Sequence, residues 1–190
     1  MKMMGQLSRK AIEEIGFASV GNDVMISDRA SFYNASKIAI GNNTRIDDFC
    51  VLSAGVGGIF VGDYVHIAVY SSLIGAGEIR LSDFSNISSR VSIYSSSDDY
   101  SGSSMTNPMV PAKFTQVLEA PVWVGRHVIV GCGSVVLPGV RLDDGVAIGA
   151  LSLVNRDCEA FGIYAGSPVR RIKNRKRDLL SFEQQLMASR

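Results

Sequence analysis

The sequence predicts an all-β fold, a parallel β-helix built from hexapeptide repeats, and three observations support this. First, the chain falls into sixes from Val124, reading VGRHVI, VGCGSV, VLPGVR, LDDGVA and IGALSL, with an aliphatic residue leading each hexad. Second, the same register recurs in paired hexads that begin at Val20, Ile40, Val61 and Leu81. Third, 46% of the residues are hydrophobic but only 8% are aromatic, and aliphatic side chains suit thin, regularly stacked β layers.

Each hexad is expected to supply one short strand, so that three hexads make a coil of about 18 residues with Gly, Asn and Asp at its corners. A single coil cannot bury its own aliphatic side chains, whereas a stack of coils encloses a continuous core. The fifth residue of each hexad should point inward, which predicts that Cys50 and Cys158 are buried. The leading residues should also point inward, among them Val130, Val136, Leu142 and Ile148.

The 190 residues are expected to form a single domain, because this length suits one core. Apolar residues at helical spacing predict a capping helix within Gln6 to Ile15, and a second helix within Arg177 to Ser189 that covers the open end of the stack. A polar, turn-rich stretch at 95–121 interrupts the repeat, and interruptions longer than roughly 15 residues are often functional. The segments are a cap at 1–19, coils at 20–94 and 122–165, an extended loop at 95–121, and a basic segment with a helix at 166–190.

Composition argues against several classes of function. The 19 basic and 18 acidic residues nearly cancel, so no global field favours nucleic acid as a partner. No uncharged apolar run approaches the roughly 18 residues that a membrane span needs, and Met1 to Gly5 lacks the apolar region of a secretory signal. Three widely spaced cysteines suggest neither a disulfide framework nor a metal cluster, so a reduced, cytoplasmic protein is expected.

Three features together resemble the hexapeptide acyltransferases, and within them the branch of galactoside or sugar O-acetyltransferases. These are the hexad register, the mid-chain loop with its DDYSG motif, and the closing run IYAGSPVRRIKNR from Ile163 to Arg175. The resemblance covers nearly the whole chain and implies a left-handed β-helix, an exception to the usual right-handed crossover. It also implies acetyl-CoA as the donor without a metal, a sugar or nucleotide-sugar acceptor, and a homotrimer with active sites between adjacent subunits.

Acyl transfer to a hydroxyl or an amine needs a base, and histidine is the side chain best matched to that role near neutral pH. The chain has two, His66 and His127. His66 closes the hexad VGDYVH at a corner, and the same hexad position holds Arg45 in the preceding coil and Asn86 in the following one. This polar column, expected to lie close to where the long loop departs, predicts that His66 is the base. Asn86 would position the acceptor or the acetyl carbonyl.

The mid-chain loop carries no histidine, although many sugar O-acetyltransferases have theirs there. Asp98 or Asp99 of this loop could instead orient His66 and stabilise the imidazolium, although Asp is also common at the start of loops. His127 occupies the fourth position of its hexad and is interpreted as a structural residue. Cys132 could form an acyl-cysteine only with an adjacent base, so direct transfer from CoA is the favoured route.

Donor binding is expected to rely on small residues, because they let the pantetheine arm approach the strands. The tight corners of the repeat would also account for such residues on successive coils, namely Gly131, Gly133, Gly149 and Ala150. In the related family, the Gly-x-Pro turn (here Gly166 to Pro168) and the basic residues after it lie near the CoA nucleotide. That resemblance favours Arg170 and Lys173 as partners of the CoA phosphates, over a purely solvated basic face.

The function predicted from the sequence is transfer of an acetyl group from acetyl-CoA to a sugar hydroxyl, in the synthesis of a surface polysaccharide or O-antigen. N-acetylation of a nucleotide-linked amino sugar is the alternative, since the same base and donor serve an amine. A non-enzymatic hexapeptide scaffold is a third reading, because the fold alone does not determine function. Zinc-dependent carbonic anhydrases share the fold but need three histidines on one metal, and this chain has two.

Overall fold

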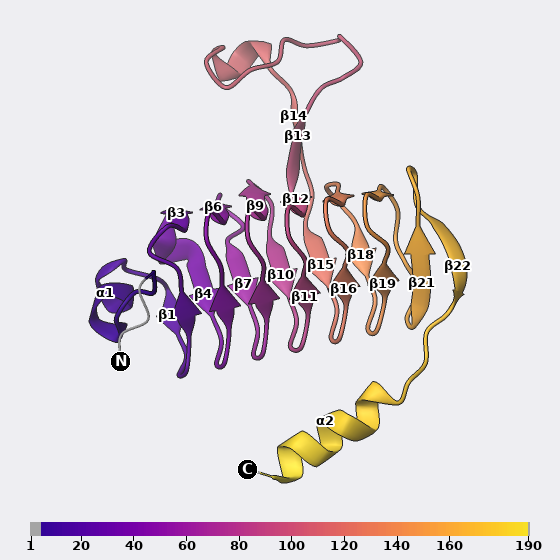
Figure 1. Ribbon diagram of the computed structural model, residues 1–190. Coiled ribbons are helices and arrows are strands. Elements are labelled where there is room, and N and C mark those ends of the chain that lie inside the picture. The colour runs from indigo at the N-terminus through magenta and orange to yellow at the C-terminus, as the bar shows by residue number, and fades with distance from the viewer. Residues whose placement is uncertain (1–4, 190) are drawn as a thin grey trace.

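The computed structural model describes residues 5–189, so residues 1–4 and 190 of the expected cap and C-terminal segment lie outside it. The chain winds into a prism of stacked coils whose faces are three parallel β-sheets (Figure 1). Two sheets contain six strands and one contains eight. Along most of the chain, successive strands join the first, second and third sheets in turn, which is the β-helix expected from the hexads.

The strands are short, and each sheet takes every third one. The first sheet contains β1 (Ser19–Val20), β4 (Ile38–Ile40), β7 (Ile59–Val61), β10 (Ile79–Leu81), β15 (Val122–Val124) and β18 (Arg141–Leu142). The second contains β2 (Met25–Ile26), β5 (Arg45–Ile46), β8 (His66–Ile67), β11 (Asn86–Ile87), β16 (Ile129–Val130), β19 (Ala147–Ile148), β21 (Gly162–Ala165) and β22 (Arg170–Asn174). The third contains β3 (Ser31–Tyr33), β6 (Val51–Ala54), β9 (Ser72–Gly75), β12 (Ser92–Tyr94), β17 (Val135–Val136) and β20 (Leu153–Val154).

The core is a continuous column of aliphatic side chains inside the prism. Cys50 and Cys158, both at fifth hexad positions, have 0% exposure, as expected. The buried fifth-position Ser134 donates from its hydroxyl to the carbonyl oxygen of Gly149 at 3.0 Å, so a polar residue is tolerated inside. The leading residues are buried as the hexad pattern predicted: Val130, Val136, Leu142 and Ile148.

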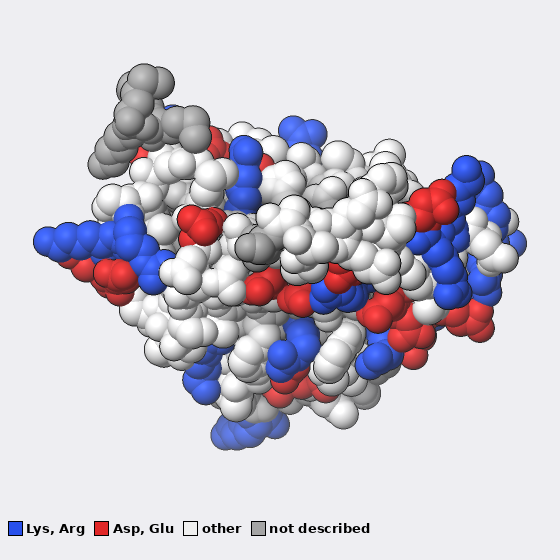
Figure 2. Space-filling model, turned by 90° about the horizontal axis from the view of Figure 1, so that it is seen from below, with Lys and Arg blue, Asp and Glu red and all other residues white. Residues whose placement is uncertain are grey.

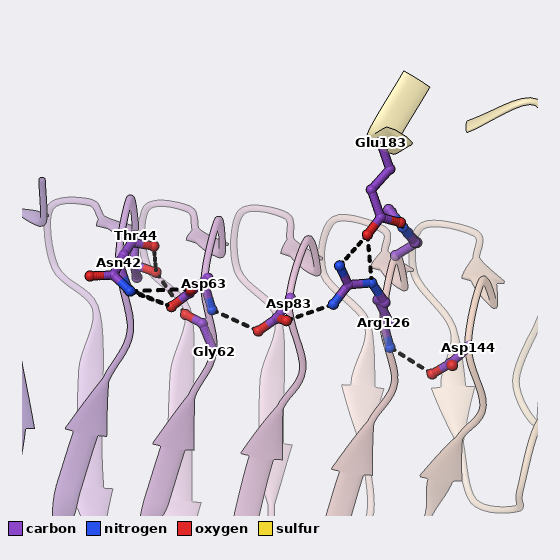
Figure 3. A network of polar contacts seen from close by, with 9 residues as sticks. Asn42, Thr44, Gly62, Asp63, Asp83, Arg126, Asp144 and Glu183 are labelled. Atoms are coloured by element: carbon purple, nitrogen blue, oxygen red, sulfur yellow. Dashed lines mark hydrogen bonds and ion pairs between the residues drawn. The ribbon is translucent and has the colours of Figure 1, made fainter. Parts of the chain in front are cut away.

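Side chains at the corner between the first and second sheets tie each coil to the next (Figure 3). The backbone N–H of Asn42 donates to Asp63 Oδ1 at 2.7 Å, and that of Asp63 donates to Asp83 Oδ1 at 2.9 Å. The same contact joins Arg126 to Asp144 Oδ1 at 2.8 Å. We call this series the corner ladder. Its partners are 21, 20 and 18 residues apart, so it accommodates the extra residues of the earlier coils.

The ladder explains which corners require glycine. A Cβ added to Gly41 would meet Asp63 Oδ1, because the Asp63 side chain folds back against this turn, and it would lie 2.6 Å from the backbone of Gly62 in the next coil. Ser82 holds the equivalent position where the next coil supplies Arg126, whose side chain extends away from the turn to Glu183. Glycine occupies the position wherever the next coil supplies Asn or Asp, at Gly21, Gly41, Gly62 and Gly125.

Aromatic rings stack along the same corner. Tyr64, Phe84 and His127 each have φ of 59°, a left-handed conformation that costs a non-glycine residue on the order of 1 kcal/mol. Their rings lie nearly parallel, with centroids 4.7 Å apart for Tyr64 and Phe84 and 5.0 Å apart for Phe84 and His127. Ring stacking therefore offsets part of the backbone strain at each turn.

The long interruption forms an arm that projects from the prism after β12 (Figure 1). Two antiparallel strands, β13 (Ser96–Asp98) and β14 (Val117–Glu119), make its stem, and a 3₁₀ turn, η2 (Ala112–Phe114), lies beyond them. The arm is thus a hairpin that holds itself together, not a structureless loop. Apolar side chains are exposed on it, including Met109 at 87% and Leu118 at 60%.

Two helices flank the coils. The first, α1 (Arg9–Glu14), begins at Ser8, whose hydroxyl accepts from the Ala11 N–H at 3.2 Å, and it lies within the range expected for the cap. The second, α2 (Leu179–Ala188), does not cover the open end of the stack, so that expectation is wrong. The antiparallel strand β22 pairs with β21 at that end instead, and α2 runs back below the lower turns of the coils (Figure 1).

The corner ladder predicts a specific glycine requirement. Gly41→Ala should lower the free energy of unfolding by about 1–3 kcal/mol, because the new methyl group is forced against the backbone of the next coil. Urea unfolding followed by circular dichroism measures this. Ser82→Ala, at the equivalent position that already carries a side chain, is the matched control and should change the value by less than about 0.5 kcal/mol. Equal losses in the two variants would contradict the ladder explanation.

The burial of two cysteines predicts selective alkylation. Burial raises the pKa of the Cys50 and Cys158 thiols to about 11, whereas Cys132 is exposed. Iodoacetamide should therefore modify Cys132 alone in the native protein and all three cysteines after unfolding, because the thiolate is the reactive form. Intact-mass and peptide mass spectrometry would count the labels. Native labelling that survives in Cys132→Ser would show that the core is more open than described.

Candidate active site

A polar column runs along the edge of the second sheet that borders the corner ladder. Arg45, His66 and Asn86 open β5, β8 and β11, and they are Cα partners across the parallel pairs, in the order obtained by counting hexads. The next two places hold Ile129 of β16 and Ala147 of β19. The polar stretch therefore ends at Asn86, one strand beyond His66.

His66 contacts a carboxylate that the hexad count did not single out. Its Nε2 lies 2.9 Å from Asp47 Oδ2, while Arg45 Nε donates to Asp47 Oδ1 at 2.6 Å. The side chain of His66 is 41% exposed and that of Asp47 is 19% exposed. Partial burial acts to raise the pKa of Asp47, but the hydrogen bonds from His66 and Arg45 outweigh it and hold this pKa below its usual value. A negative charge is thus held beside the imidazole at neutral pH.

A cleft of about 480 Å³ opens beside this pair, toward the N-terminal end of the second sheet. It carries two guanidinium groups, those of Arg29 and Arg45, and Arg29 Nη1 lies 3.3 Å from Asp48 Oδ2. The cleft is therefore a polar space of mixed charge next to His66. Its lining residues are Gly5, Gln6, Met25, Ser27, Asp28, Arg29, Arg45, Ile46, Asp47 and Asp48.

Asn86 presents an unusual acceptor. Its Oδ1 is buried and has no hydrogen-bond partner within residues 5–189. A buried acceptor left unpaired costs about 1–3 kcal/mol, and most such groups in proteins are matched by a partner. Asn86 Oδ1 is therefore an unsatisfied acceptor that lies beneath the surface, on the strand next to His66.

Asp98 and Asp99 lie apart from His66 within one chain. They belong to the arm, which leaves the prism after β12 of the third sheet, whereas His66 lies on the second sheet (Figure 1). Hydrogen bonds from Ser101 and Ser104 hold the pKa of Asp99 below its usual range. The expectation that the loop departs close to His66 is wrong for a single chain, because the loop begins at a different corner of the coil.

The four small residues expected to line the donor site are packed against neighbouring coils. A Cβ on Gly131 would lie 2.5 Å from the backbone nitrogen of Ala150, and one on Gly149 would lie 2.9 Å from the Cβ of Ala165. Gly133 has φ of +69°, which favours glycine. Coil packing and backbone conformation therefore account for these glycines, and the side chain of Leu151 at the same corner is 79% exposed.

The basic run after Pro168 divides into anchored and exposed residues. Arg175 Nη1 donates to the carbonyl oxygens of His127 and Gly145 at 2.7 and 3.1 Å, and burial lowers the pKa of its guanidinium. Arg170 and Lys173 are exposed on β22 and form no ion pair with any other described residue. Seen from below, basic side chains gather at this end of the molecule (Figure 2). Arg170 and Lys173 thus remain available to an anionic ligand.

His127 is engaged with the C-terminal helix. Its Nε2 lies 2.6 Å from Glu183 Oε2, and Glu183 Oε1 accepts from Arg126, which also donates to Asp83 Oδ2 at 2.6 Å (Figure 3). The hydrogen bond from Arg126 is the main reason that the pKa of Glu183 lies below its usual value. The His127 side chain is 11% exposed, and these contacts favour its interpretation as a structural residue.

Two features are absent from the described residues. Residues 5–189 contain no group of three His, Cys, Asp or Glu side chains placed to hold a metal ion. No helix within the same range is long and apolar enough to cross a membrane.

No protein-family model matches the sequence. The chain is, however, 57% identical over 180 residues to the dTDP-4-amino-4,6-dideoxy-D-glucose acyltransferase of Escherichia coli, with 95% of this chain and 94% of the relative covered. The chain belongs to the hexapeptide-repeat acyltransferases. The present chain is also 42% identical to AntD, an N-acyltransferase from Bacillus cereus solved with dTDP and 3-hydroxybutyryl-CoA. The TM-score is 0.94, and 98% of both chains is covered.

These relatives bear on the predictions made from the sequence. The fold is the left-handed parallel β-helix, and the acyltransferase takes its acyl group from a CoA thioester, both as predicted. WbbJ of Escherichia coli K12, a protein assigned to lipopolysaccharide O-acetylation, is 29% identical over 138 residues. The hydroxyl reading therefore has only distant support, and the alternative, acylation of an amino sugar, is the better supported of the two.

The contacts of Asp47 and Glu183 were not predicted from the sequence, for different reasons. Asp47 follows Arg45 by two residues, so it reaches His66 diagonally across the coils, and comparison of identical hexad positions does not reveal a diagonal contact. An Arg-x-Asp pair one coil before a histidine was the available signal. Glu183 lies outside the repeat altogether, 56 residues beyond His127, and no periodicity relates the two.

The contacts of Glu183 predict how α2 is held. Glu183→Ala should expose the bonds after Lys176 and Arg177 to trypsin at neutral pH, because α2 has no fully buried residue to keep it in place. Limited proteolysis with mass spectrometry would show faster cleavage there. Gln184→Ala, one residue along the same helix, is the control and should be cleaved at the wild-type rate. Unchanged cleavage in Glu183→Ala would mean that other contacts retain the helix.

The same contact predicts an acid-sensitive docking. Because the folded-state pKa of Glu183 is lowered, the stabilisation from its carboxylate is complete above the unfolded pKa of about 4.5 and is lost as pH falls through the folded value. Trypsin is inactive in acid, so pepsin or hydrogen exchange would follow the release of α2 below pH 4.5.

Proposed function

We propose that this acyltransferase transfers an acetyl group from acetyl-CoA to the amino group of a dTDP-linked 4-amino-4,6-dideoxyhexose. The observation that carries the proposal is the 57% identity, across 95% of the chain, to an enzyme that acylates such a sugar. A variant of AntD that is 42% identical to this chain was solved with dTDP-4-amino-4,6-dideoxyglucose and coenzyme A. Both ligands of the proposed reaction thus have a precedent on a fold with a TM-score of 0.94 to this one.

The layout of the second sheet supports separate regions for the two substrates. The cleft with Arg29 and Arg45 lies at one end, Arg170 and Lys173 lie at the other, and His66 lies between them. Five strand spacings of ~4.8 Å separate β8 from β22, which is about 24 Å. A CoA molecule whose phosphates meet Arg170 and Lys173 must therefore extend along the sheet to bring its thioester to His66. It would pass the coils that carry Gly131, Gly133, Gly149 and Ala150.

The proposed chemistry is direct transfer within a ternary complex. The neutral amine attacks the thioester carbon, and backbone N–H groups stabilise the oxyanion that forms. His66 takes a proton from the resulting ammonium, the C–S bond breaks, and the imidazolium returns the proton to the departing CoA thiolate. Asn86 lies beside His66 in the polar column, and we assign it the positioning of the acceptor or of the acetyl carbonyl.

We further propose that the active form is a homotrimer. The arm projects from its own chain with apolar side chains exposed, which favours a covering surface on a neighbouring subunit. In a cyclic assembly, the arm of one subunit can approach the second sheet of the next. That arrangement would bring Asp98 and Asp99 to a His66 of another chain, although their own chain keeps them apart. Light scattering should then give a mass three times the 20.4 kDa of one chain.

The acceptor is tested by thiol release from acetyl-CoA with dTDP-4-amino-4,6-dideoxyglucose, and by mass spectrometry of the acetylated product. Release should be faster than with dTDP-glucose, which offers a hydroxyl at the same carbon. Replacing acetyl-CoA by 3-hydroxybutyryl-CoA tests the acyl group. Faster turnover of dTDP-glucose would contradict N-acylation and restore the hydroxyl reading.

The role of His66 is tested with the same assay. His66→Ala should lower kcat by about 10²- to 10⁴-fold, the usual contribution of a general base. His127→Ala is the matched control and should retain the wild-type kcat, since His127 contacts α2 and not the polar column. An undiminished rate in His66→Ala would mean that the ammonium proton passes directly to the departing thiolate.

A further inference from the structure

We infer that Asp47 is a positioning residue for acyl transfer, which holds His66 in the tautomer whose Nδ1 can take the proton of the acceptor. The inference rests on the proposed function, because it gives His66 the role of base. It does not depend on the arm or on a neighbouring subunit, since both residues belong to one chain and lie on adjacent coils.

The contact arises from the register of β5 and β8. Residues two apart in an extended strand point to the same side, so Arg45 and Asp47 both face the outside of the prism. Arg45 is the Cα partner of His66, and Asp47 is therefore its diagonal neighbour. Ala68, which holds the hexad position of Asp47 one coil further on, carries only a methyl group. The imidazole can thus incline toward the preceding coil and place Nε2 at 2.9 Å from Asp47 Oδ2.

Arg45 is the second group, after His66, that keeps Asp47 ionised. Its Nε donates to Asp47 Oδ1 at 2.6 Å, and together with the His66 contact it keeps the pKa of the carboxyl low despite partial burial. An ionised carboxylate can only accept hydrogen bonds, so the Nε2 that faces it must carry hydrogen. A neutral imidazole with hydrogen on Nε2 has its lone pair on Nδ1. No hydrogen bond to Nδ1 of His66 is found within residues 5–189, so this nitrogen is free to act as a base.

The second histidine provides an internal comparison. His127 Nε2 also faces a carboxylate, Glu183 Oε2 at 2.6 Å, but its ring stacks on Phe84 and its side chain is 11% exposed. The His66 side chain is 41% exposed. Both histidines have Nε2 next to a carboxylate, but their side chains differ in exposure to solvent. Only His66 combines a carboxylate partner with a ring that a substrate can reach.

The experiment combines ring-nitrogen NMR with kinetics on the full-length protein. Two-bond ¹H–¹⁵N correlation spectra report the tautomer of each histidine, and His127→Gln assigns the two signals. The wild-type spectrum should show His66 with hydrogen on Nε2, and Asp47→Ala should give a mixture of tautomers. With the amino-sugar acceptor, Asp47→Ala should lower kcat at least about tenfold at unchanged KM, less than in a fully buried triad because the pair is partly exposed.

The matched control is Asp143→Asn. Asp143 has the same Arg-x-Asp spacing, with Arg141 Nε donating to its Oδ1 at 2.8 Å, but it lies beside the first sheet and faces no histidine. It should leave both the tautomer and kcat unchanged. Asp47→Asn, which keeps an acceptor oxygen without the charge, should fall between wild type and Asp47→Ala in both measurements.

The outcomes separate this inference from the function on which it rests. An unchanged His66 tautomer in Asp47→Ala, or a changed tautomer with an unchanged kcat, would overturn the positioning role and leave acyl transfer standing. A wild-type protein that turns over no amino sugar would overturn the proposed function. A mixture of His66 tautomers together with a lower kcat in Asp47→Ala, with neither change in Asp143→Asn, supports the inference.

Discussion

The whole structure depends on the hydrogen bonds by which each coil holds the next at the corner between the first and second sheets. A backbone N–H that the turn would leave unpaired is satisfied by the side-chain oxygen of Asn42, Asp63, Asp83 or Asp144 in the following coil. Because each bond joins nearest neighbours only, coils of unequal length still stack in register. The residue that opens each strand of the second sheet therefore falls at a constant place, and this is why Arg45, His66 and Asn86 are aligned.

Much of this arrangement could be predicted because a hexad repeat relates position to direction. The inward residues, the burial of Cys50 and Cys158, and the polar column all follow from the count. What the count cannot supply is any contact between unlike positions. The Asp47–His66 contact is diagonal, and Glu183 reaches His127 from outside the repeat. The corner from which the arm projects also has to be found by assigning each hexad to a sheet, and proximity in sequence misled that step.

The candidate site is spread along one face and is not concentrated in a pocket. Its groups come from strands that are far apart in sequence, from β2 near one end of the prism to β22 at the other. The proposed reaction therefore draws on several coils, whereas stability is a sum of local contacts between neighbours. Substitutions in one coil can consequently impair the reaction without unfolding the rest, as long as the corner ladder is kept.

The stacking of coils also fixes the distances between groups along the second sheet. The distance from His66 to Arg170 and Lys173 is set by an integral number of strand spacings, each ~4.8 Å, because the sheet can lengthen or shorten only by a whole coil. A loop may gain residues, as the earlier coils do, without altering that distance. For a donor that lies as proposed, the length that fits between His66 and β22 changes only in steps of one strand spacing.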